Sequence, residues 1–188
     1  MLMFRVVSVS PNNPEAYLEA LRPVHAEEMF EGLSATAGYE FLPDDPPPDV
    51  GALRRRYIRQ CHGGSEDGAE RWYNWVVRRQ RGAVALGYTQ ATVRDQVALV
   101  AYHIFPVSWR QGVGSAAVRE TLKIVFGLGN VEKAVARVDT RNEGSMALLS
   151  RLRFQRAQMI KAADFFKGRQ SDEWEYELHR REWDGINP

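Results

Sequence analysis

Residues 109–117 read WRQGVGSAA, and they follow closely on the apolar run VAYHIFP at 100–106. The pattern changes here from extended to helical, and Gly112 and Gly114 stand at the change. Glycine has no Cβ, so a bulky anion can approach the backbone closely, and the start of the next helix offers N–H groups and the positive end of the helix dipole. The stretch predicts a strand, a glycine turn and a helix that together bind a pyrophosphate. The alternative is a glycine turn with a structural role alone.

The length and charge of the chain favour a single domain. A chain of 188 residues suits one domain with a core of ordinary size. Its 25 basic and 24 acidic residues give a formal net charge of +1. A nucleic-acid-binding domain usually carries a clearly basic face, so we expect no nucleic-acid partner.

Cysteine content and hydropathy bear on metal binding and on compartment. Cys61 is single, which excludes an internal disulfide and a cysteine-based metal cluster, and we expect no metal. No apolar run approaches the roughly 18 residues of a membrane span, and MLMFRVV at 1–7 is too short for a signal-peptide core. The expectation is a cytoplasmic protein without membrane contact, present as a monomer or a homodimer.

The remaining pattern alternates strands with helices and shows no internal repeat. Residues 1–16 end in the breaker PNNP, and we treat them as an extension to which the pattern assigns no role. The segment 38–49 is too rich in proline for a helix interior or a central strand. Strands are expected at 17–22, 72–78, 83–93, 96–105, 134–138, 156–161 and 174–179, and helices at 25–33, 50–60, after Gly114 and at 143–152.

A second motif lies downstream of the glycine turn, DTRNEGS at 139–145 followed by MALLSRLRF at 146–154. With both motifs, residues 98–154 resemble the core of the GNAT superfamily of N-acetyltransferases, most closely the branch of ribosomal-protein acetyltransferases of the Rim type. The family's phosphate loop falls on Trp109, Gly112 and Gly114. Its Asn-x-x-Ser helix start falls on Asn142 and Ser145. The sequence departs from the family pattern at Trp109 and at Arg153, which stands where a glycine is usual.

The resemblance implies an α+β (α/β) protein with the GNAT fold, a mixed central sheet of about seven strands flanked by helices. It extends more loosely from LRPV at 21–24 to EYELHRREW at 175–183, and we take residues 17–188 as one acetyltransferase domain. It also implies acetyl-CoA as co-substrate, with backbone groups of the preceding strand and the phosphate loop in contact with it. The positions that this resemblance assigns to the cofactor are His103, Ile104, Phe105, Val107, Arg110, Gln111, Gly112, Val113, Gly114, Ser115 and Asn142.

Acetyl transfer to an amine needs a proton acceptor, because an aliphatic amine with a pKa of about 10.4 is mostly protonated at neutral pH. Three residues are candidates. His103 titrates near neutrality and lies in the expected cofactor strand. Asp164 falls in register with a carboxylate implicated as base in the Rim-like branch, and a surface carboxylate is the alternative. Glu120 is the third candidate, and helix-face glutamates of its kind are usually solvated.

The departing thiolate needs a proton donor. Many GNAT enzymes use a tyrosine on the helix after Asn142, and Leu149 occupies that position here. Ser145 matches the serine given this role in the Rim-like branch, and its alternative is close packing in the first helical turn. Asn142 is a candidate helix N-cap, a cofactor contact or both, and a capping box of Thr140 with Glu143 competes with it.

The acceptor side carries the least sequence information. Tyr39, Phe41 and Trp75 are candidates for the wall of an amine pocket, and Asp44 or Asp45 could attract a cation. The leading hypothesis is an N-acetyltransferase that acts on a protein N-terminus or peptide amine by direct attack in a ternary complex. Alternatives are a polyamine or aminoglycoside acetyltransferase and a non-catalytic acyl-CoA-binding module.

Overall fold

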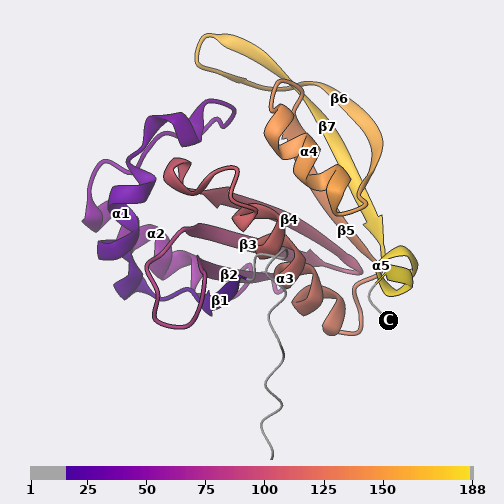
Figure 1. The fold of residues 1–188 in the computed structure, drawn as a ribbon, viewed down its shortest axis with the longest axis horizontal. Helices are drawn as coiled ribbons and strands as arrows, with labels where there is room; N and C mark the ends of the chain where they lie inside the picture. Colours follow the sequence, from indigo (N-terminus) through magenta and orange to yellow (C-terminus); the bar gives the residue numbers. More distant parts are fainter. Residues whose placement is uncertain (1–15, 187–188) are drawn as a thin grey trace, which may run out of the picture.

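One mixed sheet of seven strands organises the molecule, in the order β1-β2-β3-β4-β5-β7-β6 (Figure 1). The structure is a computed structural model, and it describes residues 16–186. Neighbouring strands are antiparallel except for β4 and β5, which are parallel. The strands are β1 (Tyr17–Ala20), β2 (Glu70–Arg78), β3 (Gly87–Arg94), β4 (Val97–Ile104), β5 (Lys133–Asp139), β6 (Gln155–Phe166) and β7 (Arg169–His179).

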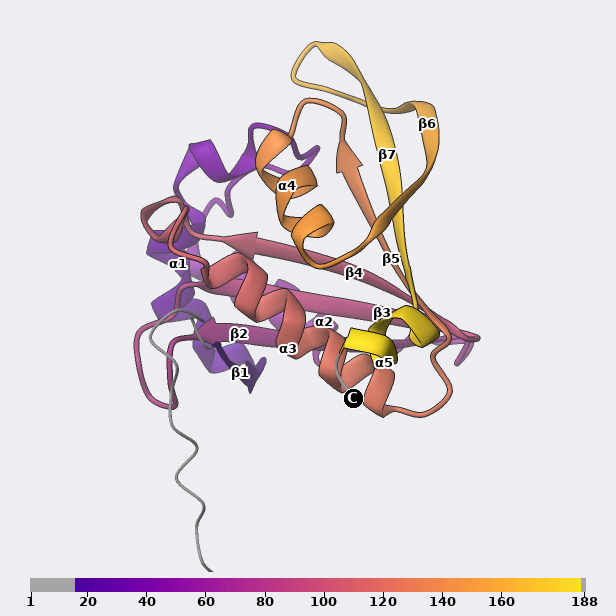
Figure 2. The ribbon, with the colours of Figure 1, turned by 45° about the vertical axis from the view of Figure 1, so that its right-hand side comes forward.

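Helices cover the two faces of the sheet unequally. On one face, α1 (Ala26–Leu33) and α2 (Val50–Gln60) pack on Val76 of β2 and on Phe105. On the other face, α3 (Val113–Gly127) and α4 (Glu143–Arg151) share the main core with residues of β3, β4, β5 and β7. Figure 2 shows α3 in front of β2 to β4 and α4 beside β5. The short helix α5 (Arg180–Ile186) ends the described chain, and short 3-10 turns lie at Pro23–His25, Thr36–Tyr39 and Pro106–Ser108.

The central parallel pair is joined over a short length only. Val97–Leu99 of β4 pair with Lys133–Val135 of β5, and beyond them both strands continue without pairing with each other. Figures 1 and 2 both show β4 and β5 diverging from this junction. Beyond Leu99, the edge of β4 on the side of β5 pairs with no strand of the described chain. An unpaired strand edge carries backbone donors and acceptors that need partners, which suits an extended ligand.

Most expected elements are confirmed, and the differences have local causes. The expected strand at 83–93 begins only at Gly87, because residues 79–86 form a loop that Arg78 holds by donating to the Ala83 carbonyl. The closing strands are longer than expected, and they form a hairpin with register shifts inside β6. The extension at 1–16 lies outside the described residues except for Ala16. Within the described part of the chain, no helix has the length and apolar character needed to cross a membrane.

Candidate functional site

The glycine turn opens α3 with unpartnered backbone donors. Gly112 is the N-cap of α3 and has φ 75°, in the left-handed region that glycine adopts without cost. No side chain caps this helix end, so the first N–H groups of α3 have no acceptor within the helix. Arg110 also has a positive φ, 58°, and is exposed beside the turn. The result is a concave set of donors with a cation next to it, which suits a phosphate group.

Gly114 keeps α3 close to its neighbours. A Cβ at this position would lie 2.8 Å from Leu148 Cδ1 of α4 and 3.5 Å from Ile104 Cγ1 of β4. The missing side chain therefore has a packing function, as well as leaving the backbone accessible. The structural interpretation of the glycine turn is supported at this residue, and phosphate binding stays a prediction.

The loop before α3 is held by its own side chains. The Trp109 indole N–H donates to the Ile104 carbonyl at 2.6 Å, which places a bulky ring at the end of β4. Gln111 donates to the Val107 carbonyl at 2.9 Å and accepts from Arg79 at 2.5 Å. These contacts fix the backbone path into the glycine turn. The tryptophan that replaces the family's usual polar residue thus has a structural function here.

The other expected cofactor positions divide by the direction of their side chains. Ile104, Phe105 and Val113 are buried in the core, whereas Val107 is 82% exposed. The Phe105 N–H donates to the Leu86 carbonyl, and the Phe105 carbonyl accepts from the Ser108 N–H, so the backbone of Phe105 is already paired within the fold. Ser115 is buried, with its hydroxyl 3.5 Å from an Arg151 nitrogen.

Asn142 begins α4. Its Oδ1 accepts from the Ser145 N–H at 3.0 Å, so Asn142 is the N-cap and the competing capping box of Thr140 and Glu143 does not form. Ser145 is half-buried in the first turn of α4. Its hydroxyl lies near the hydroxyl of Tyr102, a residue on the unpaired part of β4. The helix start and the free strand edge therefore approach each other at these two side chains.

His103 is buried on the opposite face of β4. Its ring lies 4.9 Å from the Tyr39 ring and 5.6 Å from the Tyr88 ring, centroid to centroid, and its Nε2 has no hydrogen-bond partner in the described structure. Burial, followed by the charge of Arg56, lowers the pKa of His103 to about 4. A histidine with this pKa is neutral at physiological pH and a weak proton acceptor. The geometry gives His103 a place beside the divergence but disfavours it as the base.

The carboxylate candidates lie on the β6–β7 hairpin. Asp164 is exposed on β6, where it pairs with Ser171 after a register shift and accepts from the Phe165 N–H at 2.7 Å. Glu173 of β7 lies opposite Asp139 in the sheet register and is half-buried. Burial raises the pKa of Glu173, the charge of Arg137 opposes this increase, and the charges of Asp164 and Asp139 add to it. A raised pKa makes a carboxylate a better proton acceptor than an ordinary one.

Sequence reasoning missed Glu173. It lies in an alternating run, EWEYE, whose glutamates look like the solvated face of an ordinary strand. The features that distinguish it are its partial burial and its position opposite Asp139 of a different strand. Without the register of β5 with β7, the chain offered no reason to choose it. Glu120, by contrast, pairs with Lys123 one turn along α3, as a solvated helix glutamate does.

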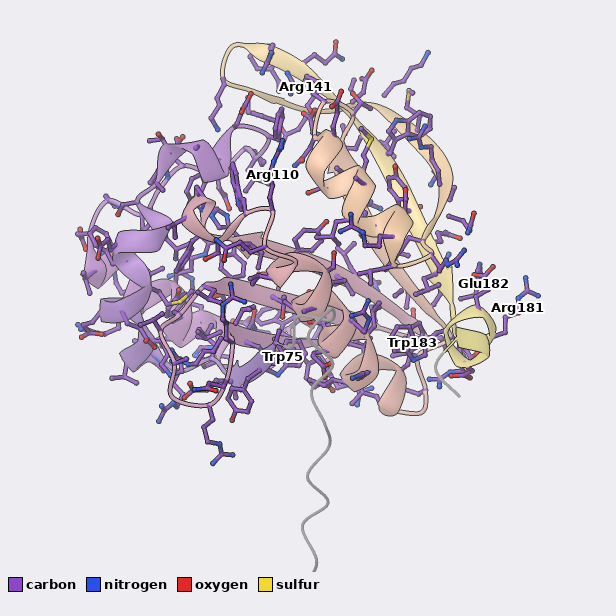
Figure 3. All side chains as sticks on the ribbon, in the orientation of Figure 1. Trp75, Arg110, Arg141, Arg181, Glu182 and Trp183 are labelled. Atoms are coloured by element: carbon purple, nitrogen blue, oxygen red, sulfur yellow. The ribbon has the colours of Figure 1, made fainter. Side chains whose placement is uncertain are left out.

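The three expected acceptor residues do not come together. Tyr39 is buried against His103, and Phe41 is half-buried in the loop that follows. Trp75 is 8% exposed and belongs to the main core together with Val118 of α3. In Figure 3, Trp75 lies in the lower part of the view, away from Arg110 and Arg141. These two arginines lie in the upper part, toward the end where β4 and β5 diverge. Trp75 is a packing residue, because its alternation along β2 directs its side chain toward α3.

The proline-rich loop contacts the hairpin tip across the divergence. Lys167 donates to the Leu42 carbonyl at 2.7 Å and to the Asp44 carbonyl at 3.3 Å, and it lies 3.9 Å from an Asp45 carboxylate oxygen. Arg56 of α2 donates to the Asp44 carboxylate at 3.3 Å. Both aspartates in this loop therefore have cationic partners.

Fold and site together define a class of protein. A mixed sheet whose parallel strands part, with an uncapped glycine-rich helix start beside the free strand edge, fits an elongated ligand that carries phosphate at one end. The unpartnered N–H groups of α3 and the unpaired edge of β4 match the two parts of an acyl-coenzyme A, its pyrophosphate and its amide-containing arm. These are the features of an acyl-CoA-dependent transferase.

Comparison with known proteins identifies the family. Residues 16–155 match the family described as the acetyltransferase (GNAT) domain, and the chain belongs to this family of acyltransferases. An uncharacterized N-acetyltransferase, p20, from Bacillus licheniformis is 24% identical over 132 residues, which cover 70% of this chain and 74% of that protein.

Two solved structures share the fold and differ in substrate. A spermidine N-acetyltransferase from Vibrio cholerae, in complex with CoA and spermine, has a TM-score of 0.76 at 17% identity, covering 91% of this chain and 99% of its own. An acetyltransferase from Salmonella typhimurium that modifies the N-terminal serine of the ribosomal protein L7/L12 has a TM-score of 0.76 at 15% identity, covering 90% and 97%.

Proposed function

We propose that the protein transfers an acetyl group from acetyl-CoA to the primary amine of a protein N-terminus or peptide, by direct attack within a ternary complex. The observation that carries the proposal is the free edge of β4 that ends beside the uncapped start of α3. An extended donor substrate held along that edge would present its acyl end deep in the divergence. An amine could then enter from the side of the proline-rich loop.

The residues divide the binding of acetyl-CoA between backbone and side chains. The N–H groups of residues 111–115 would hold the pyrophosphate, with Arg110 as a cation beside it, and the unpaired edge of β4 beyond Leu99 would pair with the pantetheine arm. Acetyl-CoA supplies an activated acyl group as a thioester. Asn142 acts mainly through the fold, because its side chain is occupied in capping α4.

The residues of the two diverging strands and the hairpin supply the proton steps. Ser145 is proposed as the donor to the leaving sulfur, because it is half-buried at the start of α4 and Leu149, the position of the usual tyrosine, is fully buried in the core. Asp164 and Glu173 are proposed as the acceptor pair for the amine proton, with Glu173 the better shielded of the two. His103 is retained only as a neutral wall of the acceptor side.

The loop chemistry favours a peptide amine over a polyamine. A polyamine carries several positive charges and is best recognised by carboxylates that lack other partners. Asp44 and Asp45, the acidic pair that hinted at such a substrate, already have Arg56 and Lys167 as partners. A single N-terminal amine followed by a neutral peptide backbone needs less negative charge.

The decisive experiment measures thiol release from acetyl-CoA with a panel of peptides, polyamines and aminoglycosides. We expect turnover with peptides that carry free N-termini and little with N-terminally blocked peptides of the same sequence. Higher kcat/KM with spermidine would move the assignment to small amines. Binding of acetyl-CoA by calorimetry without thiol release on any acceptor would instead support a non-catalytic binding module.

A further inference from the structure

The hydroxyl of Tyr102 has no assigned role in the fold. Tyr102 lies on β4 beyond Leu99, the last residue of that strand paired with β5, so it stands on the free edge segment. Its ring packs against the main core on the side of α3 and α4. Its oxygen is buried and lacks a hydrogen-bond partner within ordinary geometry. A buried hydroxyl without a partner costs free energy that a phenylalanine would avoid, so it calls for an explanation.

Ser145, in the first turn of α4, is a polar neighbour of this hydroxyl. Burial raises the pKa of Tyr102 to about 12, and Ser145 opposes this increase as a hydrogen-bonding side chain. In the described structure the Tyr102 hydroxyl has no hydrogen-bond partner of ordinary geometry. With this pKa, Tyr102 keeps its proton throughout the physiological range, so it is always able to donate.

Ser145 needs an orienting partner if it is to donate to sulfur. A serine hydroxyl rotates freely, and its acceptor lone pairs and its single proton can face several ways. The backbone N–H of Ser145 is already bound by the Asn142 side chain, which fixes the residue but not its hydroxyl. A donor at the oxygen of Ser145 would turn its proton toward the divergence and strengthen the bond that the proton makes.

We propose that Tyr102 is a positioning residue, whose hydroxyl donates to Ser145 Oγ and directs the Ser145 proton toward the leaving sulfur of the thioester. The inference rests on the proposed transferase function. In the reaction, the amine nitrogen bonds to the acetyl carbon, the carbon–sulfur bond breaks and a carboxylate takes the amine proton. Ser145 gives its proton to the sulfur and recovers one from water after the products leave. Tyr102 keeps its own proton throughout.

Kinetics of Tyr102→Phe test the role, with Tyr57→Phe as a matched control. Tyr57 also has a buried hydroxyl without a partner, but it lies on α2 in the other core cluster. We expect Tyr102→Phe to lower kcat about tenfold with both KM values changed less than twofold, because the lost bond matters mainly as the sulfur leaves. The double variant Tyr102→Phe/Ser145→Ala should be no slower than Ser145→Ala alone. An active enzyme in which Tyr102→Phe behaves like Tyr57→Phe would overturn the role.

A spectroscopic measurement tests the contact without turnover. In the protein labelled with ¹³Cζ-tyrosine, and with no ligand added, Ser145→Ala should shift the Tyr102 resonance and leave that of Tyr57 in place. An unshifted Tyr102 resonance overturns the contact even if Tyr102→Phe is slow. If the wild-type protein releases no thiol with any acceptor, the proposed function itself is overturned. This outcome is distinguished from the others because it needs no variant. Thermal unfolding of the two Tyr→Phe variants confirms that each is folded.

Discussion

The two halves of the sheet differ in how they are covered by helices and in which interactions stabilise them. Strands β2 and β3 have helices on both faces, with α1 and α2 on one and α3 on the other, whereas β4 packs on α3 and leaves Val97 and Leu99 exposed on its other face. Strands β5 to β7 have α4 and α5 on one face only, and nearly every residue of β6 is exposed. The halves pair directly over three residues of β4 and three of β5. Burial of apolar surface dominates the first half, and polar pairing dominates the open face of the second.

The open face of the second half shows this most clearly. Along β7, Trp174, Tyr176 and Leu178 turn toward the main core, and the alternate residues carry charge. Glu175 accepts from Arg137 at 2.9 Å, and Glu177 accepts from Lys133 at 2.6 Å. A surface built in this way tolerates titratable groups close together. It is the half in which a proton acceptor with a raised pKa can exist.

The largest expected difference concerns stability. Leu122→Ala in α3, whose side chain is fully buried, should lower the free energy of unfolding by about 2–5 kcal/mol, because it leaves a cavity in the double-covered half. Met159→Ala on β6, where the residue is 40% exposed, should cost less than about 1 kcal/mol. Urea unfolding of both variants measures the two losses in the free energy of unfolding. Equal losses would show that the two halves are equally well packed.

Asp139 gives the second half a distinct acid sensitivity. Burial raises its pKa, but hydrogen bonds from Arg141 and Ser171 outweigh burial and lower the pKa to about 2 from the ordinary 3.8. A lowered pKa contributes stability that is present above about pH 4 and is lost as the pH falls toward 2. The difference is worth about 2 kcal/mol. In Asp139→Asn, that part of the pH dependence of unfolding should vanish, and an unchanged pH profile would assign it to other carboxylates.

The glycine turn belongs to the first half and should affect binding more than stability. Gly114→Val should weaken acetyl-CoA binding tenfold or more, on the order of 1.4 kcal/mol, because a side chain there meets the ligand or displaces Leu148. Gly127→Ala, at the other end of α3 and with open space around the added Cβ, is the control and should bind normally. Calorimetry on both variants decides, and normal binding by a folded Gly114→Val protein would contradict a pyrophosphate site at this turn.

The two carboxylates of the hairpin can be separated by the pH dependence of the rate. If Glu173 is the base, Asp164→Asn removes a negative charge that raises the pKa of Glu173, so the lower limb of the profile should move to lower pH. If Asp164 is the base, the same substitution should abolish the limb. Glu173→Gln should abolish the lower limb if Glu173 is the base. A profile unaffected by either variant would return the role to a water molecule.

The smallest effect is expected in the first half, at His103. Because burial holds the pKa of His103 to about 4, this residue is neutral wherever the enzyme is assayed. His103→Asn should leave the position of the lower limb unchanged, even if kcat falls modestly through lost packing against Tyr39. A limb that disappears in this variant would place the base in the first half after all.

The fold could be predicted largely from the sequence because its signals are local. The glycine turn, the apolar run before it and the periodicity of α3 lie within a few residues of one another, and α2 spans Val50–Gln60 as expected. Asp49 and Asn142 cap their helices through contacts three residues away. Arg153 adopts φ 69°, the conformation for which the family uses glycine. Arg153 therefore departs from the family pattern in its side chain but keeps the backbone conformation of that position.

The site could be predicted only in part, because its chemistry depends on contacts between distant strands. The proposed contact of Tyr102 with Ser145 depends on the divergence of β4 from β5, and the position of Glu173 opposite Asp139 depends on the register of β5 with β7. The placement of Trp75 in the core depends on which face of β2 meets α3. No local pattern encodes these three facts. The sequence predicts a residue's role when that role depends on the local backbone, as in the glycine turn and the helix caps.

Lys167 at the tip of the β6–β7 hairpin has a consequence for how the two substrates reach one another. Its ammonium group binds backbone carbonyls of the proline-rich loop, more than 120 residues earlier in the chain. This contact links the β6–β7 hairpin to the loop before α2 on the side where β4 and β5 diverge (Figure 1). Under the proposed function, an amine that enters past this loop would meet a thioester held along β4, and acetyl-CoA would not have to leave before the amine binds.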